Sequence, residues 1–237
     1  MTDLSDLAKR LGAVSTAAIS GQLYKKYGMR SRAIMDVAPL NPANCRFCGP
    51  AYTLRYVPQR EDLNVATDLG NPNSIVLRAI EQIAAGSVLV MDMQANRYVG
   101  GLGDVLVSGL IARGVAAIVS DGGMRDVREI RDMGLPIFCA AAAAPPSPVG
   151  LMPVGVQETI ACGGVVVFPG DFVVGDEDGV MIVPAHLAED VAEQGAEKER
   201  LDAWVREQVS KDGGVRGRYP PDAAHMDMYN KWKAAQR

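Results

Sequence analysis

The 237-residue sequence is poor in several features that would place it in a special class of protein. Its four cysteines are too few for a disulfide-stapled chain of this size, so we expect a cytoplasmic protein. It has no apolar run of about 18 residues that could span a membrane. Residues 1–10 lack the apolar core of a signal peptide. The sequence thus predicts neither a membrane span nor a membrane partner.

Metal ligands of the zinc type are also sparse. Cys45 and Cys48 form a lone C-x-x-C, Cys139 and Cys162 are isolated, and the chain has only two histidines. A zinc site would need a second cysteine pair or histidines at suitable spacing. We interpret the C-x-x-C as structural or incidental, with a metal or redox role as the alternative.

Positive charge is scarce as well. The chain has 24 Lys and Arg against 28 Asp and Glu, which gives a net charge of −4 at pH 7. A broad nucleic-acid footprint needs a basic excess on one face, so we expect no nucleic-acid partner. An anionic ligand would have to be held by a few local groups. No lysine lies between Lys26 and Lys198, so this long stretch cannot supply the amine of a Schiff base.

An alternation of strand and helix patterns fills the centre of the chain. Near-continuous apolar runs at 87–93, 115–120 and 136–140 predict buried strands. The segments 104–114 and 125–134 between them predict helices that end in glycine. Such alternation predicts an α/β fold in which a parallel or mixed sheet is covered on both faces.

The flanking regions are patterned differently. The N-terminal third predicts a strand at 49–57 and helices at 4–11, 15–27 and 73–86. After residue 149 the chain is β-rich, and GDEDG at 175–179 indicates a hairpin turn rather than a calcium loop. Residues 186–208 predict a helix interrupted by Gly195. The aromatic residues of the polar tail are expected to dock on another surface; they are Tyr219, Tyr229 and Trp232.

The turn GLGDVL, residues 101–106, is the first candidate site motif. It matches a dinucleotide fingerprint only weakly, because the third glycine is missing. Asp104 stands at the expected N-cap, and the N–H groups of Val105 and Leu106 are expected to be unpaired first-turn donors. A helix N-terminus of this kind binds anions. The alternative is an aspartate that only caps its own helix.

The second motif is DGGMRDVREI, residues 121–130, where a Gly-Gly turn is followed by Arg125 and Asp126. One interpretation is a simple helix start, because an acidic residue favours a helix N-terminus. The other is a site in which Arg125 holds an anion and Asp126 a metal. The helix from 104 carries the chain about 15 Å away, and strand 115–120 returns it by about 20 Å. Both motifs therefore reach one edge of the sheet, where open α/β sheets bind ligands.

This combination of groups predicts a chemistry. Backbone donors and the Arg125 guanidinium suit a small carboxylate. Asp126, with Asp104 behind it, suits a hard cation such as Mg²⁺ that keeps several waters. A divalent cation beside a bound 2-oxo acid polarises the keto group and stabilises an enolate, which aldol cleavage and β-decarboxylation both require.

Two segments, GDVLVSGLIARGVAAIVSDGGMRDVREIRDMGLPIF and PGDFVVGDEDGVMIVP, resemble the RraA-like family. That family includes the 4-hydroxy-4-methyl-2-oxoglutarate/4-carboxy-4-hydroxy-2-oxoadipate aldolases and the regulator of RNase E activity. The resemblance spans about residues 15 to 206. It implies a single swivelling-type α/β/β domain with a C-terminal helix, assembled as a homotrimer or homohexamer. The catalytic domain would be 1–206, and the extension 207–237 would pack on a neighbouring subunit.

The resemblance also implies roles for individual residues. Asp126 would bind Mg²⁺ or Mn²⁺, Asp104 would hold metal-bound water, and Arg125 would contact the pyruvyl oxygen. Gly103 and the backbone amides of Val105 and Leu106 would contact the substrate carboxylate. Glu199, from the C-terminal helix of a neighbouring subunit, would complete the site.

We therefore expect a divalent-metal-dependent lyase that cleaves a 4-hydroxy-2-oxo acid to pyruvate, with oxaloacetate decarboxylation as a side activity. The alternative is a non-catalytic regulator that binds an RNA-degrading enzyme. That branch of the family lacks the Arg-Asp pair, so the pair at 125–126 favours the enzyme. Two departures from the family pattern would reshape the pocket: the extension 207–237 and the loop AAAAAPPSP at 140–148.

Overall fold

The computed structural model describes residues 4–62 and 69–236. Its helices are α1 Leu4–Gly12, α2 Thr16–Tyr27, α3 Ile75–Gln82, α4 Asp104–Ala112, α5 Val127–Arg131, α6 Ala188–Asp212 and α7 Ala223–Ala234. Its strands are β1 Ala33–Ile34, β2 Ala38–Pro39, β3 Phe47–Pro58, β4 Val88–Asp92, β5 Ala117–Met124, β6 Ile137–Ala142, β7 Leu151–Val156, β8 Ile160–Cys162, β9 Val165–Val167, β10 Phe172–Asp176 and β11 Gly179–Val183. Within these ranges, no helix combines the length and apolar character that a membrane crossing requires.

The main sheet has the strand order β1-β11-β10-β3-β4-β5-β6-β2. Strands β3, β4, β5 and β6 are parallel, as the alternation of strands and helices predicts. The long strand β3 pairs with three strands. Its residues 47–50 pair with β10, residues 51–55 pair with β4, and residues 54–58 pair with β7, which lies off the linear order. One continuous strand therefore joins the parallel part of the molecule to the antiparallel part.

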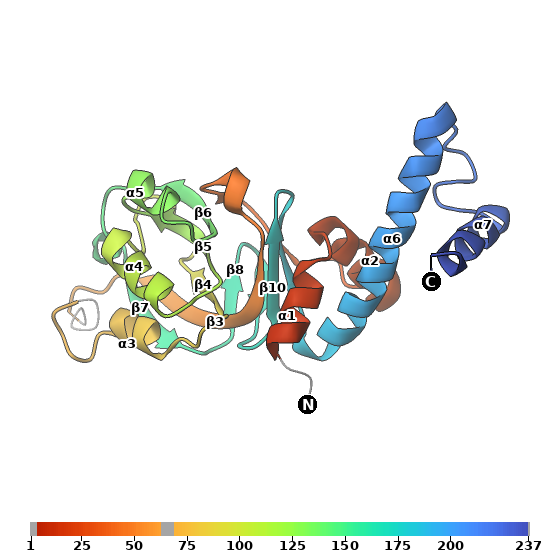
Figure 1. Cartoon of the computed structure of the whole chain (residues 1–237). Coiled ribbons are helices and arrows are strands. Elements are labelled where there is room, and N and C mark those ends of the chain that lie inside the picture. The colour runs from red at the N-terminus through yellow and green to blue at the C-terminus, as the bar shows by residue number, and fades with distance from the viewer. Residues whose placement is uncertain (1–3, 63–68, 237) are drawn as a thin grey trace.

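Three apolar clusters define the layers seen in Figure 1. The first lies between β3–β6 and helices α3, α4 and α5, and includes Leu110 and Ile130. The second fills the space between the parallel strands and β8–β11, and includes Val119 and Val173. The third packs β10 and β11 against α1, α2 and α6. This is the predicted α/β/β arrangement, with a second helical layer on the far side.

Helix α6 differs from the sequence prediction at Gly195. We expected an interruption there, but α6 runs from Ala188 to Asp212 without a break. A Cβ at residue 195 would lie 2.5 Å from Val14 Cγ1, so the glycine is required by close packing against the α1–α2 corner. The loss of helix propensity is offset by tertiary contact.

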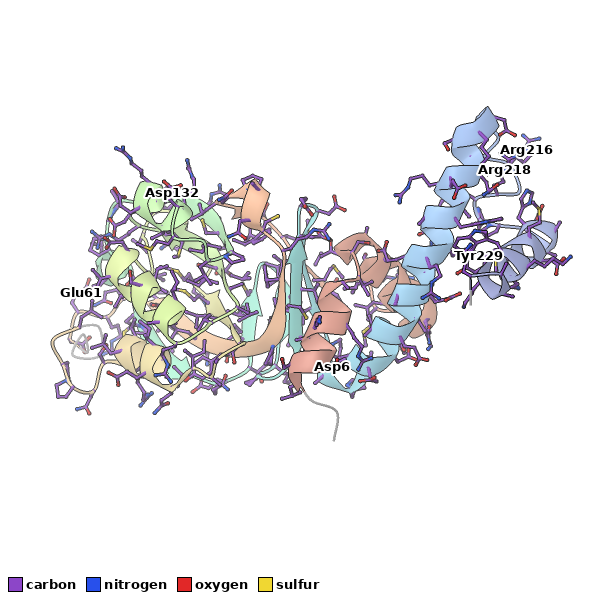
Figure 2. All side chains as sticks on the ribbon, viewed as in Figure 1. Asp6, Glu61, Asp132, Arg216, Arg218 and Tyr229 are labelled. Atoms are coloured by element: carbon purple, nitrogen blue, oxygen red, sulfur yellow. The ribbon has the colours of Figure 1, made fainter. Side chains whose placement is uncertain are left out.

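The extension beyond residue 206 folds back as α7 on its own chain. Trp204 and Val205 of α6 and Tyr229 of α7 form a small separate core, and Figure 2 shows Tyr229 between the two helices. The Trp204 and Tyr229 rings meet edge to face with centroids 5.6 Å apart. The predicted docking of tail aromatics thus takes place on α6, and contact with a neighbouring subunit stays a prediction.

Candidate active site

The two sequence motifs lie side by side at the carboxyl edge of the parallel strands. The Gly101 N–H donates to the Gly123 carbonyl at 2.9 Å, and the Arg125 N–H donates to the Leu102 carbonyl at 2.9 Å. Gly100 forms an isolated parallel bridge with Gly123. The predicted meeting of the 101–106 and 121–130 segments is therefore confirmed, although the roles of their residues are not tested by it.

The glycine pair before Arg125 does not make the turn that we expected. Strand β5 continues through Gly122 and Gly123 to Met124. A Cβ on Gly122 would lie 2.5 Å from Met93 Cβ, and one on Gly123 would lie 2.6 Å from the Val99 carbonyl oxygen. Both glycines are needed for close approach inside the sheet. The chain turns instead at Asp126, which adopts left-handed φ and ψ values of 50° and 40°.

The start of α4 also departs from the prediction. Gly103, not Asp104, is the N-cap, and Asp104 is the first helical residue. The Asp104 Oδ1 atom accepts a hydrogen bond from the Val105 N–H at 2.8 Å, so that amide is engaged. Among the residues that the structure describes, the Leu106 N–H has no partner. One first-turn donor, rather than two, is therefore available to an anion.

Asp126 supplies the missing cap from another part of the chain. Its Oδ2 atom accepts a hydrogen bond from the Asp104 N–H at 3.3 Å. Gly103 makes this possible, since a Cβ at that position would lie 2.2 Å from Asp126 Oδ2. The Asp126 carboxylate is exposed and faces the positive end of the α4 dipole. Asp104 and Asp126 are thus neighbours in space although 22 residues separate them.

The Arg125 side chain enters a pocket of about 300 Å³ beside these carboxylates. Gly103 and Leu106 line the same pocket. The arginine stem passes close over Gly100, where a Cβ would lie 2.2 Å from Arg125 Cγ. Within residues 4–62 and 69–236 the Arg125 guanidinium has no hydrogen-bond or ion-pair partner. A half-buried guanidinium without a partner can accept an anionic ligand at low desolvation cost.

The donor set at this edge fits a hard divalent cation. Asp104 and Asp126 offer carboxylate oxygens, which Mg²⁺ and Mn²⁺ prefer, and Mg²⁺ commonly binds one or two carboxylates and keeps several waters. No cluster of three or more His, Cys, Asp or Glu occurs in the described part of the chain, so a closed zinc-type cage is not formed there.

The C-x-x-C pair lies elsewhere, at the start of β3. Burial raises the pKa of the Cys48 thiol to about 12 and also raises the pKa of Cys45. A thiol that is held neutral is neither a good metal ligand nor a redox nucleophile. These values favour the structural interpretation of the pair.

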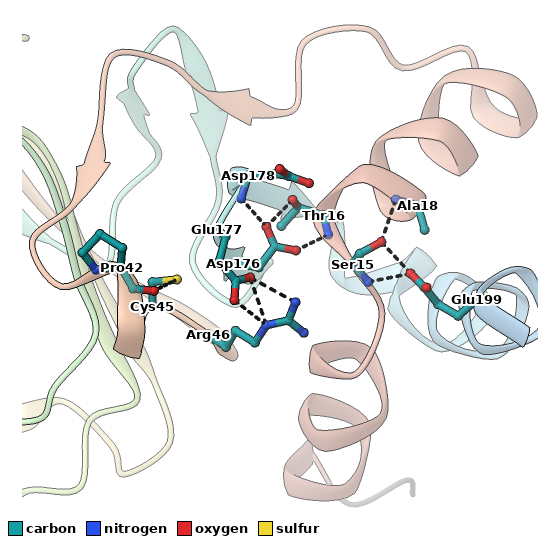
Figure 3. A network of polar contacts seen from close by, with 10 residues as sticks. All are labelled: Ser15, Thr16, Ala18, Pro42, Cys45, Arg46, Asp176, Glu177, Asp178 and Glu199. Carbon is teal, nitrogen blue, oxygen red and sulfur yellow. Dashed lines mark hydrogen bonds and ion pairs between the residues drawn. The ribbon is translucent and has the colours of Figure 1, made fainter. Parts of the chain in front are cut away.

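Glu199 is not brought to the site within one chain. It lies on α6, and the antiparallel strands β10 and β11 separate this helix from α4 and α5 (Figure 1). Its Oε1 atom accepts a hydrogen bond from the Ser15 N–H at 3.0 Å, as Figure 3 shows. Only a second subunit could place Glu199 beside Asp126, so its implied role stays a prediction.

The GDEDG segment is a hairpin, as predicted. Asp176 of β10 pairs with Gly179 of β11 across a two-residue turn. The buried Asp176 carboxylate accepts hydrogen bonds from the Thr16 N–H at 2.7 Å and the Thr16 hydroxyl at 2.6 Å (Figure 3). Its oxygens thus anchor the N-terminus of α2 and are not arranged as a calcium loop.

Two buried carboxylates beneath the site escaped the sequence analysis. Asp92 ends β4 and Asp121 lies in β5, and both are buried. Asp121 Oδ1 accepts a hydrogen bond from the Met93 N–H at 2.6 Å, and Asp92 Oδ1 accepts one from the Gln94 N–H at 3.1 Å. Burial raises the pKa of Asp121. The available signal was an aspartate directly after each apolar run, at residues 92 and 121. These side chains hold the turn that follows β4.

Comparison with known proteins shows the family and agrees with the fold. A family model described as "RraA-like: Aldolase/RraA" matches residues 1–182. The "Putative 4-hydroxy-4-methyl-2-oxoglutarate aldolase" of Halalkalibacterium halodurans is 31% identical over 210 residues, which cover 87% of this chain and 90% of the relative. The 4-hydroxy-4-methyl-2-oxoglutarate aldolase of Thermus thermophilus is 30% identical, over 77% of this chain and 91% of the relative.

A solved structure from the RraA family is also similar to this chain. The crystal structure of Streptomyces coelicolor RraAS2, described as an unusual member of the RNase ES inhibitor RraA protein family, is 31% identical with a TM-score of 0.76. The match covers 85% of this chain and 96% of that one. The paired motifs, the layered fold and these likenesses together establish that the chain belongs to the RraA-like family.

Proposed function

We propose that this protein is a divalent-metal-dependent lyase that cleaves a 4-hydroxy-2-oxo acid to pyruvate by aldol cleavage. The observation that carries the proposal is that the Arg125 guanidinium, which has no partner among the described residues, lines a small pocket at the start of α4, and that the neighbouring Asp126 carboxylate caps this same helix. The aldolase names of the relatives support the same class of reaction. Decarboxylation of oxaloacetate is proposed as a side activity, because it passes through the same pyruvate enolate.

In this proposal the chain's own groups bind and orient the substrate. The free Leu106 N–H and the N-terminal dipole of α4 hold the substrate carboxylate. The Arg125 guanidinium donates to the 2-oxo oxygen, where negative charge develops as the C3–C4 bond breaks. The proton of the 4-hydroxyl leaves as that bond breaks, C4 becomes a carbonyl, and the electron pair of the C3–C4 bond forms the pyruvate enolate. C3 then takes up a proton from solvent water to give pyruvate. Asp104 Oδ2, which accepts no hydrogen bond from the described residues, can take up the 4-hydroxyl proton through a water molecule.

Asp126 would hold Mg²⁺ or Mn²⁺, with Asp104 beside it. The bound cation would supply Lewis-acid stabilisation of the enolate. Arg125 would neutralise the same charge from another direction. The Asp126 carboxylate is already held at the start of α4 by its contact with the Asp104 N–H.

A direct test is pyruvate release, coupled to NADH oxidation by lactate dehydrogenase. The substrates are oxaloacetate and 4-hydroxy-4-methyl-2-oxoglutarate, each with EDTA-treated protein and after Mg²⁺ is restored. Because free cations decarboxylate oxaloacetate slowly, a protein-free sample with the same Mg²⁺ is the blank. We expect release that depends on both protein and cation. Full activity in EDTA would contradict the metal dependence, and no release under any condition would contradict the lyase.

The alternative function is that of a regulator of an RNA-degrading enzyme, which the description of the Streptomyces relative as a member of an RNase ES inhibitor family supports. A protein that lacks lyase activity but inhibits a purified RNase E-type enzyme at stoichiometric concentration would establish it instead.

A further inference from the structure

The turn that follows β4 contains two consecutive residues in an unfavourable backbone conformation. Gln94 and Ala95 have φ values of 57° and 51°, in the left-handed region that residues with a Cβ rarely occupy. The Asn96 N–H closes the turn by donating to the Met93 carbonyl at 3.0 Å. A conformation of this kind persists only where surrounding structure enforces it, so the turn needs support from outside itself.

The buried carboxylates of Asp92 and Asp121 supply that support. Asp92 Oδ1 accepts hydrogen bonds from the Gln94 N–H at 3.1 Å and from the Gln94 side-chain amide at 2.9 Å. Asp121 Oδ1 accepts one from the Met93 N–H at 2.6 Å. The second oxygen of each carboxylate accepts from a backbone N–H of the β8–β9 hairpin, both at 3.3 Å. Each carboxylate is thus held from two sides, and together they fix the position of the turn.

The chain that leaves this turn runs along the end of β5 to the proposed active site. The Gly123 N–H donates to the Asn96 carbonyl at 3.2 Å, and the Gly123 carbonyl accepts from the Gly101 N–H at 2.9 Å. Segment 96–102 is therefore aligned residue by residue with the part of β5 that leads to Arg125. A shift of the turn would move the start of α4 relative to Arg125.

We propose that Asp121 is a positioning residue for this site. Its carboxylate fixes the turn after β4, and through that turn it sets the register of the α4 start against Arg125 and Asp126. Because Asp121 lies on β5 itself, one side chain connects the two segments that form the site. The catalytic consequence rests on the proposed function, whereas the register does not. A misplacement of about 1 Å in an active site can lower turnover by about 10²-fold.

Hydrogen exchange of the protein without metal or substrate tests the register independently of activity. Mass spectrometry follows amide exchange in peptides that cover residues 98–104 and 122–127. We expect exchange in both peptides to be at least about tenfold faster in Asp121→Ala than in wild type, because the aligned segments open locally. Asp121→Asn should restore most of the protection, because its carboxamide oxygen can still accept from the Met93 N–H.

The matched control is Asp171→Ala. Asp171 is also buried and also accepts two backbone hydrogen bonds, from Phe168 at 3.1 Å and from Ala185 at 3.3 Å. It lies near the amino end of β4, away from the proposed site, because the next residue pairs with Pro50. Its loss should leave exchange in the two peptides unchanged. If both alanine variants accelerate exchange equally, Asp121 stabilises the protein only in general and the proposal is wrong.

A second pair of variants disturbs the turn without changing a buried carboxylate. Gln94 is exposed, so the core should tolerate its replacement. Glycine adopts a φ of this sign freely, whereas a β-branched valine does not. Both variants lose the side-chain amide, so their comparison isolates the backbone conformation. We expect exchange in both peptides to be at least about tenfold faster in Gln94→Val than in Gln94→Gly. Equal exchange would overturn the role of the turn.

The kcat for pyruvate release from oxaloacetate then connects the register to the reaction. We expect Asp121→Ala and Gln94→Val to lower kcat by about 10²-fold, while Asp121→Asn and Gln94→Gly retain most of the wild-type value. Faster exchange with an unchanged kcat would overturn the positioning role and leave the lyase intact. The expected exchange pattern without pyruvate release from wild type would refute the lyase and support the register.

Discussion

The carboxylate of Asp126 accepts a hydrogen bond from the backbone N–H of Asp104, with 3.3 Å between Oδ2 and N. The N-cap residue of α5 thus caps α4 as well. The group that we propose as the metal ligand is therefore already held in place by backbone, which reduces the ordering required when a cation binds.

Asp126→Asn separates the two tasks of this side chain. Asparagine keeps an oxygen that can accept from the Asp104 N–H but loses the negative charge that a divalent cation needs. We expect the unfolding free energy to change by less than about 1 kcal/mol, and Mn²⁺ affinity measured by calorimetry to fall by more than about 100-fold. Asp132→Asn, at the other end of α5, is the control. Normal Mn²⁺ binding by folded Asp126→Asn would remove Asp126 from the metal site.

Arg125→Lys tests the guanidinium. A lysine keeps the charge but cannot reproduce the planar fork of donors. We expect kcat for pyruvate release to fall by about 10²–10³-fold, the range for loss of one oxyanion donor, while Mn²⁺ affinity stays nearly unchanged. Arg128→Lys, on the exposed face of α5, should behave as wild type. If Arg125→Lys is folded and fully active, the arginine is scaffolding and the site assignment is wrong.

Part of this site could be predicted from the sequence. The lengths of the helix from 104 and of the strand from 115 bring Asp104, Arg125 and Asp126 to one edge by simple geometry. The identity of the cap could not be predicted, because Asp126 reaches α4 from a different segment. Gly122 and Gly123 were likewise misjudged, since their neighbours Met93 and Val99 are distant in sequence. Local rules describe a turn well, but they do not report what packs against it.

Glu199 offers a test of a shared site. A mixture of Glu199→Ala chains with Asp126→Asn chains can rebuild a site only if the two side chains come from different subunits. For a symmetric oligomer mixed at random in equal amounts, we expect about one quarter of wild-type activity, although each variant alone is nearly inactive. The measurement is pyruvate release after the variants are co-expressed. Light scattering should show a trimer or hexamer, and a mixture that stays inactive would confine Glu199 to its contact with Ser15.

Two helical glycines give opposite expectations for stability. In Gly195→Ala the new Cβ would meet Val14 Cγ1 at 2.5 Å, so we expect a loss of about 1–3 kcal/mol from overpacking. In Gly21→Ala no atom lies within 4 Å of the new Cβ, so we expect a gain of up to about 1 kcal/mol from helix propensity. Chemical denaturation of both variants measures the difference. Equal stabilities would contradict the packing explanation for Gly195.

The contact between α6 and α7 should depend on pH through Glu197. Hydrogen bonds from Lys233, at 2.6 Å, and from Tyr229, at 2.9 Å, hold the pKa of the Glu197 carboxyl below its usual range. Because the folded state favours the ionised form of Glu197, this residue stabilises the folded protein at pH values above the pKa that it has in the unfolded chain. That stabilisation is lost as the pH falls through the lower pKa of Glu197 in the folded protein.

Glu197→Gln should therefore cost up to about 1 kcal/mol near neutral pH, since the pair is partly exposed. The difference from wild type should vanish as the pH of a thermal-unfolding series is lowered from about 7 to about 2. Asp227→Asn, which removes an exposed ion pair with Lys231 on α7, is the control for general charge effects. A difference that is independent of pH would show that Glu197 acts by packing alone.

The pairing of strand β3 determines which parts of the protein unfold together. The first residues of β3 form hydrogen bonds with β10 and its later residues with β4. The antiparallel and parallel parts of the sheet therefore cannot separate without breaking hydrogen bonds of this one strand. Amide hydrogens along β3 should therefore exchange with solvent only through global unfolding, and both halves should share one exchange free energy. Amides of α7, which rests on a small core of its own, should exchange far sooner. The protein would then consist of one cooperative body that carries the proposed active site and one appendage that frays independently of it.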